Sequence, residues 1–143
     1  MKVLVINGPN LARLDIRDSS IYGDMSYPQL VAHIESAAKT NGFTSDVRQS
    51  DDEATIISWL NEAADGSIPV IINPAAFSHY SYAIRDAAVL VKSPLIVVHL
   101  SNPLAREEFR HTSVISGVAD GTIGGFGPNS YVLALIALKA LTS

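Results

Sequence analysis

The chain has no cysteine among its 143 residues. This absence excludes disulfide bonds, thiol catalysis and thiolate metal sites. It is also consistent with a cytoplasmic protein, because disulfides accumulate in oxidising compartments. We therefore expect a cytoplasmic protein whose stability comes from a hydrophobic core.

Long hydrophobic runs and clusters of basic residues are missing as well. No apolar run approaches the roughly 18 residues that a membrane-spanning helix needs. The N-terminus leads directly into an apolar segment, without the basic region and cleavage site of a signal peptide. The net charge is −4 and the basic residues are scattered, so we expect neither a membrane nor a nucleic acid as a partner.

Familiar cofactor and catalytic motifs are absent too. The sequence has no P-loop, no GxSxG elbow and no HExxH pair. No two histidines have the local spacing of metal ligands, so we expect no metal site. Gly125 and Gly127 follow the last predicted strand rather than the first, so they do not form a dinucleotide-binding fingerprint.

What the chain has instead is a regular alternation of strand and helix patterns, with 48% hydrophobic and 17% charged residues. Apolar runs without polar alternation are typical of strands that are covered on both faces. The predicted strands span residues 3–6, 43–48, 68–72, 95–100 and 121–126. The predicted helices span residues 27–41, 53–64, 79–91 and 130–141, and a charged helical turn spans 105–110. Ser50 or Asp51 is the expected cap of the second helix, and Ser78 of the third.

Helix-length connections between successive strands predict parallel strands and right-handed crossovers. The chain of residues 1–143 is therefore expected to form a single α/β domain. Its predicted architecture is a flavodoxin-like, doubly wound, five-stranded parallel sheet with the first strand at its centre.

Polar residues or glycines follow every predicted strand at its carboxyl end. They are Asn7 and Asn10, then Gln49, then Asn73, then His99 with Ser101 and Asn102, then Gly124, Gly125 and Gly127. The carboxyl ends of the strands in an open parallel sheet converge on one crevice, which predicts a site there. Residues 11–23, which follow the first strand, form a long polar segment of the kind in which α/β proteins place their chemistry.

Residue types alone leave several roles open. A tyrosine such as Tyr22 serves as a base only beside a cation, because its ordinary pKa lies near 10. Spacing alone favours the other interpretation, in which Tyr22 anchors the loop and Arg17 lies in solvent. His99 is either a core histidine or a general acid. Arg106 and Arg110 share a face of the predicted turn, where they either pair with neighbouring glutamates or hold a substrate.

Taken together, these segments resemble the type II 3-dehydroquinate dehydratases over essentially the full length. The resemblance rests on INGPNLARL, Arg17 with the IYG after it, RQSDDEATIISWLNEA, INPAAFSHYSYAIRDA, VHLSNPLAREEFRH and the glycine-rich turn before the last helix. It implies a trans-dehydration of 3-dehydroquinate to 3-dehydroshikimate through an enolate, without cofactor or metal.

The resemblance also implies a role for each matching residue. Tyr22 would be the base, with its pKa lowered by Arg17. Asn10 would help hold the water that stabilises the enolate, and His99 would protonate the departing hydroxyl.

The other implied residues bind substrate or support the loop. Asn73 and the backbone N–H groups of Leu100 and Ser101 would hold the substrate carboxylate. His79 and Arg110 would bind the ring hydroxyls. Arg106 would support the mobile loop, and Asp86 would approach from a neighbouring subunit. The family pattern further implies a homo-oligomer, a trimer-based dodecamer, in which residues 11–23 act as a lid.

The sequence departs from the family pattern at Val97, where glutamate is usual, and at Ala75 and Ser130, where glycine is usual. A carboxylate beside His99 would orient it and favour its protonated form. Valine does neither, so His99 is expected to be a poorer acid. This departure leaves an alternative open, a family member that binds a quinate-like ligand as a sensor or regulatory subunit. A third possibility, a flavin-binding protein, is suggested by the fold alone.

Overall fold

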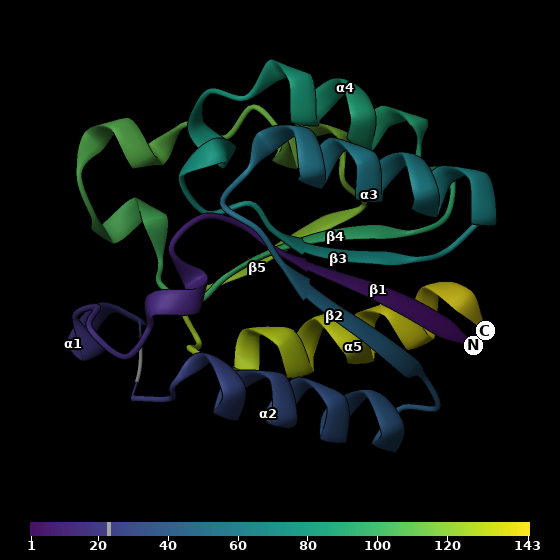
Figure 1. The fold of residues 1–143 in the computed structure, drawn as a ribbon, viewed down its shortest axis with the longest axis horizontal. Helices are drawn as coiled ribbons and strands as arrows, with labels where there is room; N and C mark the ends of the chain where they lie inside the picture. Colours follow the sequence, from purple (N-terminus) through teal and green to yellow (C-terminus); the bar gives the residue numbers. More distant parts are fainter. Residues whose placement is uncertain (23) are drawn as a thin grey trace.

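A parallel sheet of five strands forms the middle layer of the molecule (Figure 1). We describe the protein from a computed structural model, which covers residues 1–22 and 24–143. The strands are β1 (Lys2–Asn7), β2 (Thr44–Gln49), β3 (Val70–Asn73), β4 (Leu95–His99) and β5 (Gly121–Gly124). Their order, β2-β1-β3-β4-β5, confirms the predicted flavodoxin-like α/β fold. The middle strand is β3 rather than β1, which lies between β2 and β3.

Two pairs of helices cover the sheet (Figure 1). Helices α2 (Tyr27–Thr40) and α5 (Asn129–Thr142) lie on one face, and α3 (Glu53–Gly66) and α4 (Tyr82–Leu90) lie on the other. No helix among the described residues has the length and apolar character needed to cross a bilayer.

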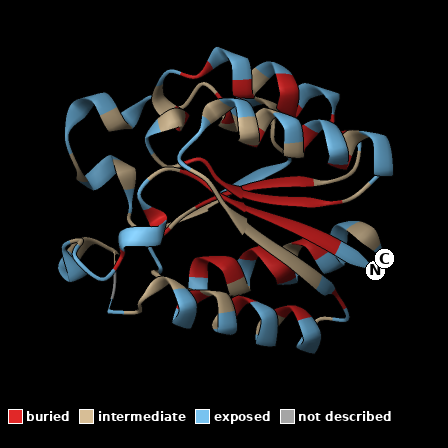
Figure 2. Ribbon diagram, viewed as in Figure 1, coloured by how far each residue is buried: buried red, intermediate tan, exposed pale blue. Residues whose placement is uncertain are grey.

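The strand β1 shows why the sequence pattern lacks polar alternation. Val3 and Val5 pack into the core with α2 and α5, whereas Leu4 and Ile6 pack into the core with α3 and α4. Figure 2 shows the interior strands buried along most of their length. Both faces of the interior strands are covered, so apolar residues are needed at every position.

Two predicted helix caps are wrong. The cap of α3 is Asp52, which accepts a hydrogen bond from the Thr55 N–H (3.2 Å), and not Ser50 or Asp51. Helix α4 is capped by Ser81, so Ser78 is not a cap. Residues Ala75–His79 instead form a separate 3-10 turn. His79 therefore precedes α4. The predicted helix of residues 79–91 had placed it on the same helix as Asp86, which is wrong.

The predicted charged turn over residues 105–110 is also corrected. Two short 3-10 turns, Pro103–Ala105 and Glu108–His111, take its place. Arg106 lies between them with an extended backbone (φ −115°, ψ −163°). Arg106 and Arg110 are therefore not neighbours on one helix, and any shared role depends on the tertiary fold.

The polar segment after β1 contains more regular structure than its sequence suggested. It forms a 3-10 turn at Leu11–Arg13 and a four-residue helix, α1 (Ser19–Tyr22). Leu11 and Leu14 are buried and fasten the start of the segment to the core. The last residue of the predicted 11–23 lid, Gly23, lies outside the described residues.

Ala75 has a backbone conformation that suits glycine better than alanine. Its φ of +50° lies in the left-handed region, which costs an L-residue with a Cβ about 1–2 kcal/mol. This is one of the two positions at which the family pattern has glycine.

We predict that Ala75→Gly raises the free energy of unfolding by about 0.5–1 kcal/mol, because relief of the left-handed strain exceeds the entropy cost of glycine. Urea denaturation measures the change. Ala76→Gly is the control, since Ala76 is not among the residues with positive φ, and it should lower stability. A loss of stability in both variants would contradict the strain argument.

Candidate active site

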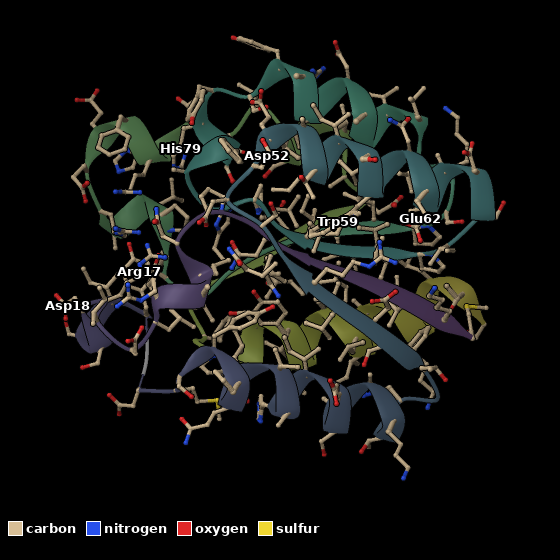
Figure 3. All side chains as sticks on the ribbon, viewed as in Figure 1. Arg17, Asp18, Asp52, Trp59, Glu62 and His79 are labelled. Carbon is tan, nitrogen blue, oxygen red and sulfur yellow. The ribbon has the colours of Figure 1, made fainter. Side chains whose placement is uncertain are left out.

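A cavity of about 120 Å³ lies at the carboxyl ends of β1, β3 and β4. The polar segment after β1 and the two 3-10 turns after β4 complete its walls. Figure 3 shows that Arg17 and His79 both lie at this end of the sheet, whereas Glu62 lies toward the far end of α3. The position matches the predicted crevice, and its small size suits a small polar ligand.

The cavity brings together ten of the eleven predicted site residues. They are Asn10, Arg17, Tyr22, Asn73, His79, His99, Leu100, Ser101, Arg106 and Arg110. The eleventh, Asp86, is exposed on α4 and does not line the cavity. Its approach to the site of a neighbouring subunit stays a prediction.

Two arginines contact Tyr22 in different ways. The Arg17 guanidinium carbon lies 3.5 Å from the centre of the Tyr22 ring. The Arg106 Nη2 donates a hydrogen bond of 2.6 Å to the Tyr22 hydroxyl oxygen. Spacing alone favoured a solvated Arg17, whereas the family resemblance paired it with Tyr22; Arg17 does lie over the ring, but the cation at the phenol oxygen is Arg106.

Arg106 is an enclosed charge, with a side chain that is only 14% exposed. Its Nη1 donates to the Ser101 hydroxyl at 3.2 Å. Its Nε is buried without a hydrogen-bond partner among the described residues. The guanidinium thus joins the segment after β1 to the segment after β4, while its Nε–H stays without an acceptor in the part of the chain that the structure describes.

His99 ends β4 among groups that disfavour its charged form. Burial, followed by the nearby charges of His79 and Arg106, lowers the pKa of His99 to about 4. Its Nε2 lies 3.5 Å from the Ser78 hydroxyl, a distance at the limit of a hydrogen bond. His99 is therefore neutral at pH 7, in line with the poor acid expected from the sequence.

Val97 explains part of this neutrality. The residue is fully buried in the core between the sheet and helices α3 and α4. Alternation along the strand places its side chain on the same face of β4 as His99. The position that could supply a carboxylate to the histidine therefore supplies only methyl groups.

His79 and Arg110 each have one side-chain group committed to a protein acceptor. The His79 Nδ1 lies 2.8 Å from the Thr112 carbonyl, which fixes the hydrogen on Nδ1 and leaves Nε2 as an acceptor in the neutral ring. The Arg110 Nε donates to Glu107 at 3.0 Å. Both side chains line the cavity, where the two can offer an acceptor and donors to hydroxyl groups.

A close backbone contact joins the ends of β1 and β3, next to residues that line the cavity. The Gly8 N–H donates to the Asn73 carbonyl at 2.8 Å. A Cβ on Gly8 would lie 2.8 Å from the Pro74 carbonyl oxygen, which is too close for any other residue. Glycine at this position therefore lets the ends of β1 and β3 lie against each other beside the cavity.

A buried chain of polar side chains, which the sequence did not indicate, connects the ends of β1 and β3 to helix α5. The Asn73 side-chain amide donates to the Tyr131 hydroxyl at 3.0 Å, and that hydroxyl donates to Asn7 Oδ1 at 2.5 Å. Asn7 is one of the polar residues that the sequence places at a strand end. Tyr131 lies in an almost wholly apolar helix, where nothing in the local pattern separates it from ordinary core.

Comparison with known proteins gives matches over nearly the whole chain. The family model described as dehydroquinase class II matches residues 1–139. The 3-dehydroquinate dehydratase of Salinispora tropica is 50% identical over 140 residues, which cover 98% of both chains. That of Mycobacteroides abscessus is 49% identical over 135 residues, or 94% of both chains.

Solved structures give the same result. The type II dehydroquinase from Propionibacterium acnes has a TM-score of 0.94 and 47% identity, covering 97% of this chain and 96% of that one. A 3-dehydroquinate dehydratase-like protein from Bifidobacterium longum has a TM-score of 0.76 and 42% identity, covering 99% of this chain and 98% of that one.

We predict that the His99 ring stays neutral as the pH falls and gains its proton only near pH 4. Val97→Glu should raise the pKa of His99 by about 1–3 units, because a carboxylate on the same face of β4 favours the imidazolium. NMR titration of the ring nitrogens measures both values. Val97→Gln is the control of equal size without charge, and an equal shift in both variants would show that charge is not the cause.

Proposed function

The chain belongs to the class II dehydroquinase family, and on that premise we propose that it dehydrates 3-dehydroquinate to 3-dehydroshikimate. In this reaction a C–H bond α to the ketone breaks, its electrons form an enolate, and the enolate expels the β-hydroxyl as water. The observation that carries the proposal is the Tyr22 hydroxyl hydrogen-bonded to Arg106 in a cavity that also contains His99.

Tyr22 is the base in this proposal. A phenol accepts a proton from carbon only in its ionised form, which a close positive charge favours. Arg106 supplies that charge at the oxygen, and Arg17 supplies a second one over the ring. The proposal thus gives Arg106 a larger part than the loop support implied by the family resemblance.

Asn10 helps to hold a water that stabilises the enolate. The turn that carries it is fixed by Asp51, whose Oδ1 accepts from the Asn10 N–H at 2.9 Å and from Gln49 Nε2 at 3.0 Å. Asn10 itself has a left-handed φ of 68°, which asparagine tolerates. A fixed donor at this edge stabilises negative charge without reorganising during the reaction.

The substrate binds through its carboxylate and hydroxyls. We assign the carboxylate to Asn73 with the N–H groups of Leu100 and Ser101, and the ring hydroxyls to His79 and Arg110. His99 protonates the departing hydroxyl. Its low pKa makes the protonated form scarce at pH 7, on the order of one molecule in a thousand, so this step is the weak point of the site.

We further propose that residues 11–23 act as a lid and that the chain assembles into a trimer-based dodecamer. The Arg106–Tyr22 hydrogen bond supports the lid, since it fastens α1 to the segment after β4. Exposed Tyr80 and Tyr82 near Asp86 support the assembly, in which Asp86 would reach a neighbour's cavity. A cytoplasmic location stays a prediction from the sequence.

One observation favours a second candidate, a relative that binds a quinate-like ligand with little turnover. Val97 leaves His99 without a carboxylate, and burial disfavours its charge. If the valine limits turnover, Val97→Glu should raise kcat by roughly tenfold, or about 1.4 kcal/mol of barrier. An unchanged kcat would mean that the site works with valine.

The proposed function predicts that the purified protein converts 3-dehydroquinate to a conjugated enone without added metal. Ultraviolet absorbance follows the product, and the rate should be unchanged by a chelator. Tight binding of 3-dehydroquinate without turnover would favour the second candidate instead.

Tyr22→Phe is predicted to abolish exchange of the substrate's α-proton with deuterated water while binding changes only a few-fold, because the base is removed and the ring remains. Proton NMR measures the exchange. Exchange that continues at the wild-type rate would remove Tyr22 from the role of base.

Arg106→Gln should lower kcat/KM by more than Arg17→Gln does, because it removes the cation that donates to the Tyr22 hydroxyl oxygen. Steady-state kinetics with 3-dehydroquinate measures both changes. Arg13→Gln is the control, because Arg13 is exposed and paired with Asp15. A larger loss for Arg17→Gln would make Arg17 the principal cation.

A further inference from the structure

Tyr131 places one polar group inside an otherwise apolar part of the core. Its side chain is fully buried in α5 among residues such as Leu135 and Leu138. A phenylalanine would fill the same volume, and a buried hydroxyl is costly unless it is hydrogen-bonded. The partners of this hydroxyl are the side chains of Asn7 and Asn73, at the ends of adjacent strands β1 and β3.

The directions of these hydrogen bonds fix the orientation of the Asn73 amide. Its Oδ1 accepts from the Ala75 N–H at 3.1 Å, so Nδ2 must be the group that faces Tyr131. The Tyr131 oxygen accepts that hydrogen, and its own hydrogen goes to Asn7 Oδ1. An amide nitrogen has two hydrogens, and the second one remains for a ligand in the cavity that Asn73 lines.

We propose that Tyr131 is a positioning residue: together with the Ala75 N–H, its hydroxyl fixes the Asn73 amide so that an N–H group, and not the carbonyl oxygen, meets the carboxylate of the substrate. The inference rests on the proposed function, which assigns that carboxylate to Asn73. A reversed amide would place an acceptor against an anion, so the hydroxyl selects for a negatively charged ligand without touching it.

The first test is Tyr131→Phe. The carboxylate is bound equally in the substrate complex and in the transition state, so the loss of its donor should raise KM with little change in kcat. We expect KM for 3-dehydroquinate to rise roughly tenfold. Tyr27→Phe is the matched control, because Tyr27 meets the same chain at Asn7 over a longer distance of 3.5 Å; its KM should stay within about twofold of wild type.

A double-mutant cycle separates positioning from a general packing role. In an Asn73→Ala background, Tyr131→Phe should leave KM unchanged, because the amide on which it acts is gone. Equal effects of Tyr131→Phe with and without Asn73 would overturn the inference. If Tyr131→Phe does not fold, Asn7→Ala takes its place. Asn7→Ala removes the acceptor that orients the Tyr131 hydroxyl, so it should raise KM about threefold. An unchanged KM in this variant overturns the inference.

The wild-type protein separates this inference from the proposed function. No turnover of 3-dehydroquinate by the wild type would overturn the proposed function, and with it the premise of the inference. Turnover by the wild type with an unchanged KM in folded Tyr131→Phe would overturn the inference alone.

Discussion

The close approach of two backbone segments governs the rest of the site. β1 and β3 end side by side, and Gly8 contacts Pro74 at a distance that leaves no room for a side chain. The residues that flank this contact, among them Pro9, Asn73 and Ala75, line the cavity. The sheet supplies the rigidity, because these strands are covered on both faces by packed helices. The positions of the site residues thus depend on the packing of the core beneath them.

The pattern of apolar residues was sufficient to predict the fold, because every interior strand must be apolar on both faces and every helix on one. Boundaries were less accurate for a local reason. Ser50, Asp51 and Asp52 are all good helix caps, and only the backbone conformation shows that Asp52 accepts from the Thr55 N–H. The start of α4 was misplaced for the same reason. Ser78 and Ser81 are both good helix caps, and only the backbone shows that Ser81 is the cap.

Part of the site was visible in the sequence and part was not. The convergence of strand ends follows from topology, so residues such as Asn73 and His99 could be brought together without coordinates. The hydrogen bond between Arg106 and Tyr22 spans 84 positions and depends on an extended residue between two turns. No local pattern encodes it. The role of Tyr131 could not be predicted for a different reason. Its helix is almost wholly apolar, so the sequence pattern does not distinguish Tyr131 from an ordinary core residue.

The contact between Arg106 and Tyr22 also bears on how fast a turnover cycle can end. It joins the two segments that form the walls of the cavity, so under the proposed mechanism it must break before product escapes and form again around the next substrate. A stronger contact would favour the ionised form of Tyr22 and slow product release. The overall rate is then greatest at an intermediate strength of this one hydrogen bond, and a variant that improves the chemical step need not improve the enzyme.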